Sequence, residues 1–220
     1  MFLGHFAVGL ALKKAEPKLS LGALIAGAMA MDVIFAVLLL LGIEHVRISP
    51  GVTAVSPFEF FDYPLSHSLT GSLLISVIVF LFAYYIIMKN SSHKMRISLV
   101  LSLAVLSHYV LDVISHTPDM PIVGNDSIKL GFSLWNNMAA TLIVEFGMLA
   151  AGAVIYLKAT RSVSFIGKYG LVIFLILLTF LFVAGLVTPP PPDSASLAAF
   201  IIIGISLFAA LAFWIDQNRE

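Results

Sequence analysis

The sequence predicts an all-α fold: a polytopic membrane helix bundle of six transmembrane helices, preceded by one short apolar helix. Three observations carry this prediction. Of the 220 residues 60% are hydrophobic, only 11% are charged, and the apolar residues gather in long runs. An average soluble domain is about 45–50% apolar and about 25% charged. The composition excludes a disordered chain, an ordinary soluble domain and a nucleic-acid-binding protein that works through a basic face.

Six apolar stretches are long enough to cross a membrane, because a helix needs about 20 apolar residues to span about 30 Å of hydrocarbon. They run over Leu19–Gly42, Leu65–Met88, Ile97–Ser115, Leu134–Leu157, Ile166–Val187 and Leu197–Ile215. We expect a single integral-membrane domain over residues 1–220. Its metal-site part covers roughly residues 1–157, and two further spans follow over residues 166–215.

The stretch Phe2–Leu12 is apolar but too short to span a bilayer. We expect it to be either a re-entrant helix or a helix that lies at the membrane interface. No basic residue precedes it, and Lys13 and Lys14 follow it, which is a poor match to a signal peptide. We therefore expect this segment to remain attached to the chain.

The basic residues alternate between the two sides of the predicted bundle. Ten lie in segments that share one side: Lys13, Lys14, Lys18, Lys89, Lys94, Arg96, Lys158, Arg161, Lys168 and Arg219. The opposite side has only Arg47 and Lys129. The positive-inside rule then predicts a multi-pass protein of a prokaryotic plasma (inner) membrane, with both termini in the cytoplasm.

Ionisable side chains occur inside the predicted spans, where each costs several kcal/mol and usually marks a functional site. Together with two residues at a membrane edge they are His5, Asp32, His67, His108, Asp112, Glu145, His116 and Asp119. A rise of about 1.5 Å per helical residue places most of them between the middle and the outer half of the bilayer. We therefore expect several helices to contribute to one site there.

The strongest local pattern is His108 with Asp112, because residues four apart share one face of a helix. Imidazole and carboxylate groups together suit a divalent metal such as zinc, and three protein ligands with one open position form a catalytic zinc site. The chain has no cysteine, which excludes disulfides, thiolate zinc sites and a cysteine nucleophile. The expected metal is zinc, and its ligands are the imidazole nitrogens and carboxylate oxygens.

The sequence assigns provisional roles to the whole cluster. The predicted metal ligands are His67, His108, Asp112, His5 and Asp32. Glu145 or Asp32 is predicted to act as the general base. The predicted outer-shell or substrate-facing residues are Ser66, Ser68, Ser107, His116 and Asp119. A structural reading stays open for each of them, since a single membrane histidine such as His5 also serves as a helix–helix hydrogen bond.

Four short motifs resemble the YdjM-like family of membrane-bound metal-dependent hydrolases. They are Gly4-His5, the Asp32 of Met31-Asp32-Val33, Ser66-His67-Ser68, and Ser107-His108 followed by Asp112, and they fall within roughly residues 1–125. The chain has a single Asp32 where the family tends to carry an acidic pair, and Tyr63-Pro64-Leu65 where it tends to carry Arg-Gly. The resemblance implies a metal-dependent hydrolase but no substrate.

The leading functional hypothesis is a membrane-embedded hydrolase with an intramembrane metal. Its substrate would be a lipid-like ester, amide or phosphoester that reaches the outer half of the bilayer from the surrounding membrane lipids. Two alternatives come from other classes of protein. Buried Asp, Glu and His residues also build the pathways of proton- or metal-coupled transporters, and the same groups can simply fasten the helices of a membrane scaffold together.

Overall fold

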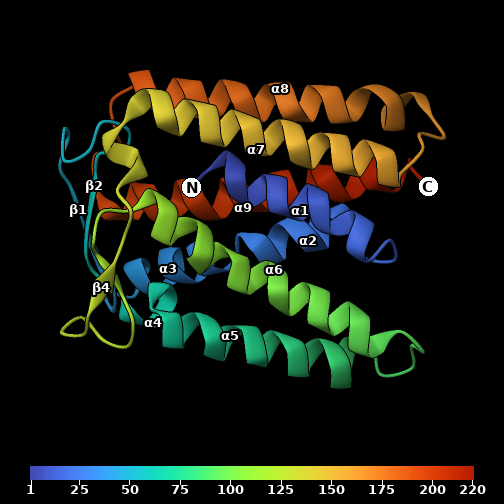
Figure 1. Ribbon diagram of the computed structural model, residues 1–220, viewed down its shortest axis with the longest axis horizontal. Helices are drawn as coiled ribbons and strands as arrows, with labels where there is room; N and C mark the ends of the chain where they lie inside the picture. The colour runs from blue at the N-terminus through green and yellow to red at the C-terminus, as the bar shows by residue number, and fades with distance from the viewer.

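The computed structural model describes residues 1–220 as a bundle of long helices that lie side by side (Figure 1). The long helices are α5 (Leu69–Phe82) with its π-helical extension η1 (Ala83–Ile87), α6 (Lys94–Ser115), α7 (Met138–Ala159), α8 (Phe165–Val187) and α9 (Ser194–Asp216). These five are long and apolar enough to cross a membrane. The predicted all-α bundle is thereby confirmed. The remaining predicted span, Leu19–Gly42, differs from the other five.

The span predicted over Leu19–Gly42 is broken into two helices. α2 (Leu21–Ala28) and α3 (Ala30–Leu40) meet at Met29 with a bend of 54°. We predicted one continuous stretch over Leu19–Gly42, and its apolar composition does not reveal the break. Because a helix leaves its last carbonyl groups without partners, the end of α2 provides free acceptors in the interior of the bundle.

The second and fourth predicted spans also begin with an irregular segment. Leu65 belongs to a single turn, α4 (Pro64–His67), and Ser68 then takes an extended conformation before α5 starts. A 3₁₀ turn, η2 (Leu134–Asn136), precedes α7, whose first amides are capped by the side chain of Asn137. The predicted starts at Leu65 and Leu134 therefore fall before the long helices themselves.

The first helix, α1 (Leu3–Ala15), lies among the others and not along the surface of the bundle (Figure 1). It packs closely against α7 at Gly152, because a β-carbon at that position would lie only 2.5 Å from the carbonyl oxygen of Ala7. Leu3, Phe6 and Leu10 are fully buried in the largest apolar core of the molecule. The structure packs Phe2–Leu12 inside the bundle, which fits the re-entrant alternative, and its place relative to the bilayer stays a prediction.

A buried ion pair holds α1 at the end of the bundle where the C-terminus lies (Figure 1). The ammonium group of Lys13 donates to Asp216 at 2.6 Å and to the carbonyl oxygen of Leu19 at 2.8 Å. The Tyr156 hydroxyl donates to the second oxygen of Asp216 at 2.7 Å. All charges of this contact are paired, so it joins α1, α7 and α9 without needing a ligand.

Two short hairpins cover the opposite end of the bundle. β1 (His45–Ile48) pairs antiparallel with β2 (Phe58–Asp62), and β3 (Met120–Pro121) pairs with β4 (Lys129–Leu130). They belong to loops that the charge pattern predicts to be outside. Which end faces the cytoplasm stays a prediction. The amino group of Met1 lies within the bundle, in contact with Asp112.

Candidate metal centre

A cluster of histidine and aspartate side chains lies inside the bundle, towards the end that carries the hairpins. Asp32 comes from the first turn of α3, His67 from the end of α4, and His108 and Asp112 from α6. His116 caps the C-terminus of α6. The side chains of the histidines and of Asp112 are at most 4% exposed, whereas that of Asp32 is 27% exposed. Asp32 is therefore the member of the cluster with an open surface.

Three imidazole nitrogens surround one carboxylate oxygen. The Oδ2 atom of Asp112 is 3.0 Å from Nε2 of His108, 3.7 Å from Nε2 of His67 and 3.9 Å from Nε2 of His116. Oδ1 of Asp32 lies 3.5 Å from Nε2 of His108 and 3.6 Å from Nε2 of His67. Most of these separations are too long for hydrogen bonds.

The same separations suit ligands of one metal ion. Ligand atoms about 2.0–2.1 Å from a tetrahedral Zn²⁺ lie about 3.3–3.4 Å from one another. The donor atoms of His67, His108 and Asp112 all lie within 4.8 Å of one another, as do those of His5, Asp32 and His108. Because the two groups share His108, they describe one site with overlapping sets of donors.

The orientation of His108 is determined by the bend between α2 and α3. Its Nδ1 is 2.8 Å from the carbonyl oxygen of Ala28, the last residue of α2. A carbonyl can only accept a hydrogen bond, so Nδ1 carries a proton, and Nε2 is the nitrogen through which His108 would bind a metal. This Nε2 is buried and forms no well-oriented hydrogen bond, although Oδ2 of Asp112 lies 3.0 Å away. A buried nitrogen and carboxylate in this arrangement are suited to sharing a bound cation.

His67 is oriented by a chain of two hydrogen bonds. The Ser66 hydroxyl donates to Oε2 of Glu44 at 2.6 Å, and its oxygen lies 2.7 Å from Nδ1 of His67. Since the hydroxyl proton is directed at the carboxylate, the Ser66 oxygen accepts from Nδ1–H of His67. The Nε2 atom of His67 then faces Asp32 and Asp112. Outer-shell contacts of this kind raise the basicity of a metal-ligating histidine.

His116 shows the same arrangement with a carboxylate directly. Its Nδ1 is 3.0 Å from Oδ1 of Asp119, and that carboxylate also accepts from the hydroxyl groups of Tyr63 and Thr117 at 2.8 and 2.9 Å. Burial and the neighbouring Asp119 raise the pKa of Tyr63 well above its usual value, so Tyr63 remains a hydrogen-bond donor. Sequence reasoning placed His116 and Asp119 outside the ligand set, and the structure brings His116 to its edge.

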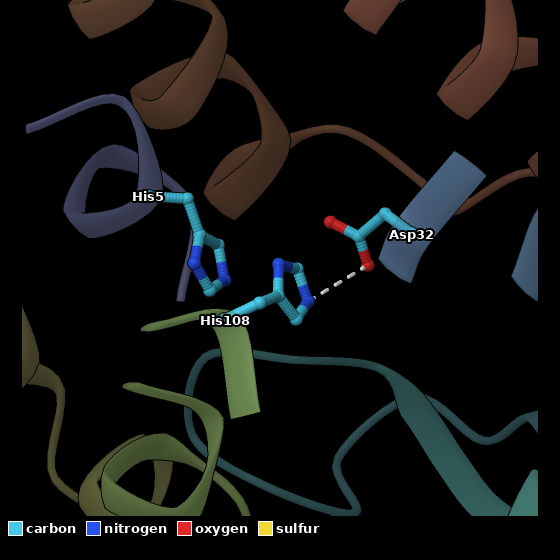
Figure 2. Close-up of side chains that lie close together, drawn as sticks. All are labelled: His5, Asp32 and His108. Atoms are coloured by element: carbon cyan, nitrogen blue, oxygen red, sulfur yellow. Dashed lines mark ion pairs between the residues drawn. The ribbon is translucent and has the colours of Figure 1, made fainter. Parts of the chain in front are cut away.

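The remaining oxygen of Asp112 faces α1. Its Oδ1 atom is 2.5 Å from the amino group of Met1 and 3.1 Å from Nε2 of His5. The rings of His5 and His108 stack 3.8 Å apart, with Asp32 on the far side of His108 (Figure 2). Nδ1 of His5 is buried without a partner. His5 therefore lies in contact with the cluster but turns its free nitrogen away from the Asp112 contact.

Glu145 occupies a different position from the one expected of a general base. Its two oxygens accept from the backbone amides of Phe2 and Gly4 at 2.9 and 2.8 Å. The carboxylate thus caps the N-terminus of α1, where unpaired amides and the helix dipole favour a negative charge. Glu145 is completely buried, and its contact with α1 positions His5.

Of the three serines predicted to support the site, one contacts the histidine cluster and two do not. Ser66 belongs to the hydrogen-bond chain of His67, as described above. Ser68 instead caps α5 by accepting from the amide of Gly71, and Ser107 donates to the carbonyl oxygen of Ala104 in its own helix. Neither Ser68 nor Ser107 contacts the histidine cluster through its hydroxyl.

Sequence reasoning missed Glu44, which follows the first predicted span and resembles an ordinary loop residue. It is 1% exposed and also accepts from the amides of Leu65 and Ser66. The only signal for it in the sequence is an acidic residue between two spans, which is weak. Also missed were Phe60 and Trp135, whose rings lie 4.8 and 4.4 Å from that of His116.

Comparisons with protein-family models, with curated proteins and with solved structures each returned no match for this chain. The resemblance to the YdjM-like family therefore depends on the four motifs alone and stays a prediction. What can be stated of function comes from the site: a helical membrane protein has a buried His/Asp cluster that could hold a metal ion.

Proposed function

We propose that this protein is a membrane-embedded metal-dependent hydrolase, with zinc as the metal and a lipid-like ester, amide or phosphoester as the substrate. The observation that carries the proposal is the convergence of three imidazole Nε2 atoms on one carboxylate. His67, His108 and His116 each have Nδ1 bound to an acceptor, and each directs Nε2 at Asp112. Histidines whose Nδ1 is held by an acceptor, so that Nε2 faces the site, are typical of metal ligands.

The residues divide into ligands, a base and positioning groups. We assign His67, His108 and Asp112 as the metal ligands, with His116 at the edge of the site. A bound zinc ion would lower the pKa of a coordinated water towards about 7 and so provide a nucleophile at neutral pH. Asp32 is the cluster member with exposed surface, so it can hold and deprotonate an incoming water. Glu145 and His5 position α1 against Asp112.

Rigidity favours a resident metal over a transported one. A transport site must release its ion, and its ligands need to move for that to occur. Here the ligand His67 is fixed through Ser66 to buried Glu44, and the ligand His108 is fixed to the backbone of α2. Such outer-shell support typically raises metal affinity about 10–100-fold. A hydrolase retains its metal, whereas a transporter would pass it across the bilayer.

The proposal is tested first by metal content. The protein is purified in detergent without chelator, and bound metal is measured by mass spectrometry on the wild type, His108→Ala and Asp112→Ala. We expect about one zinc per chain in the wild type and almost none in the two variants. His93→Ala is the matched control, because His93 is an exposed loop residue. Equal metal in all four proteins, or none in any, would contradict the proposal.

Activity then separates hydrolysis from transport. The zinc-loaded protein is assayed with fluorogenic ester, amide and phosphoester amphiphiles, and in parallel for zinc uptake in proteoliposomes. Turnover that is lost in Asp32→Asn, while metal is retained, supports the hydrolase. Zinc uptake that depends on Asp32, without turnover of any of the three substrates, would replace it with the transporter.

A further inference from the structure

A pocket of about 230 Å³ lies at the hairpin end of the bundle, next to the candidate metal centre. Its walls are aromatic: Phe58, Phe60 and Phe61 of β2, and Trp135 of η2. Asp119 also lines it, and this carboxylate accepts from Nδ1 of His116. Because Phe60 and Trp135 both contact the His116 ring, only this layer of side chains separates the pocket from the cluster.

The acceptors and hydroxyls that line the pocket are already engaged within the chain. Glu59 accepts from Arg47 and Ser49 at 2.7 and 3.2 Å. Asp119 accepts from Tyr63, His116 and Thr117. The Thr53 hydroxyl donates to the carbonyl oxygen of Ser56 at 2.8 Å and accepts from the amide of Ser56 at 2.7 Å, and that of Thr117 donates to Asp119.

Two polar groups remain, and both are donors. Lys129 lines the pocket and makes no side-chain hydrogen bond or close ion pair, although its charge acts on nearby Asp62, and the indole N–H of Trp135 donates to no side chain or carbonyl. The two lining carboxylates, Glu59 and Asp119, are held by donors of the chain, so the free hydrogen-bonding side chains are donors, which favours a ligand that offers acceptors. Since one of the donors is a cation, the ligand group it suits best is an anion.

We propose that this pocket binds the anionic headgroup of an amphiphile, a phosphate or a similar acid attached to an apolar chain. The volume is below the range of about 300–1,000 Å³ that encloses a whole drug-sized ligand, so it suits a headgroup and not a whole lipid. The aromatic walls contact the first apolar atoms, as aromatic side chains do at membrane interfaces. This assignment rests on the proposed function in treating the bound molecule as a substrate.

Binding can be measured apart from the metal. The chain has two tryptophans, so Trp214→Phe leaves Trp135 as the only indole reporter. This protein, treated with chelator in a neutral detergent, is titrated with dihexanoyl phosphatidic acid, dihexanoyl phosphatidylcholine and inorganic phosphate. We expect a saturable change in Trp135 fluorescence with phosphatidic acid, and binding weaker by about tenfold for each of the other two.

Substitution of the cation completes the test. Lys129→Gln is expected to weaken phosphatidic acid binding by about tenfold, whereas Lys129→Arg retains it. Lys158→Gln, an exposed lysine at the opposite end of the bundle, is the matched control and should bind as tightly as the parent. Equal binding of the zwitterionic lipid, no effect of Lys129→Gln, or phosphate bound as tightly as phosphatidic acid would each overturn the proposal. Zinc content, measured on the same variants, reports on the metal site separately.

Discussion

The backbone carbonyl oxygen of Ala28 accepts the Nδ1 proton of His108 at 2.8 Å, and this contact depends on the break between α2 and α3. In an uninterrupted helix, the carbonyl of residue 28 would instead accept from an amide one turn further on. The bend therefore converts a structural acceptor of the backbone into a support for a candidate metal ligand.

The hydrogen-bond pattern predicts which nitrogen binds metal. On titration of chelator-treated protein with zinc, the ¹⁵N signals of Nε2 in His67 and His108 are expected to shift, while their Nδ1 atoms remain protonated. NMR of protein with ¹⁵N-labelled histidine measures this directly. His93, exposed in a loop, serves as the internal control and should not respond at stoichiometric zinc. Metal bound through Nδ1 would contradict the assigned tautomers.

Glu44 is predicted to act on the metal through Ser66 and His67. Glu44→Gln keeps the size of the side chain but removes the charge that holds the Ser66 hydroxyl, so zinc affinity should fall by about 10–100-fold with the helix content retained. Zinc competition with a chromophoric chelator measures the affinity. Glu59→Gln is the control, because Glu59 lies on the hairpin and is bound to Arg47. Equal losses of zinc affinity in the two variants would contradict a role for the hydrogen-bond chain from Glu44 through Ser66 to His67.

The close contact of α1 with α7 predicts opposite outcomes at two glycines of the same helix. A β-carbon on Gly152 would lie 2.5 Å from the Ala7 carbonyl oxygen, whereas one on Gly147 meets nothing within 4 Å. Gly152→Ala should push α1 away and lower stability by about 1–3 kcal/mol, and Gly147→Ala should cause no loss, since alanine favours helix. Thermal unfolding in detergent compares them. A harmless Gly152→Ala would mean that α1 packs elsewhere.

The hairpin over the aromatic pocket is predicted to loosen in acid. The hydrogen bond from His45, with a further one from Asn125, holds the pKa of Asp62 below its usual value of 3.8. A carboxyl with a lowered pKa stabilises the fold above its ordinary pKa, and this stabilisation is lost as the pH falls through the lowered value. Fluorescence of Trp135 between pH 5 and 2 should report the change, because Phe60 of the hairpin stacks near it.

A control separates the two acids of the hairpin. Arg47 lowers the pKa of Glu59 as well, so part of the acid response belongs to that residue. Asp62→Asn should remove the part due to the His45 contact, and Glu59→Gln should remove the part due to the Arg47 contact. An acid transition that is unchanged in both variants would show that other groups control the hairpin.

The long helices and much of the cluster were predictable because both follow from spacing and composition. His108 and Asp112 are four residues apart on one helix, and the structure indeed places them 3.0 Å apart. The depth estimate likewise places Asp32 and His67 in one slab, from the middle to the outer half of the bilayer. Hydropathy cannot distinguish a helix inside a bundle from one on its surface. The sequence therefore predicts either a re-entrant or an interfacial helix for the segment that forms α1.

The depth of a side chain in the bundle could be predicted from the sequence, but the direction in which it points could not. Glu145 lies deep in its helix as expected, but its carboxylate faces the amides of Phe2 and Gly4, and only the packing of α1 determines this. Glu44 lies in a loop that folds back over the cluster, so its burial depends on tertiary structure. The two breaks, at Met29 and Ser68, likewise occur in apolar or polar sequence without a helix-breaking proline at the break itself.

The insertion of α1 has a consequence for how the membrane protein matures. His5 is synthesised before the residues that it meets: Asp112 and His108 leave the ribosome about a hundred residues later, and Glu145, which caps its helix, later still. The proposed metal site can therefore be completed only after most of the spans are in the bilayer. Because a metal that binds the assembled state alone stabilises that state, zinc capture would mark the end of assembly and retain chains whose first segment has docked.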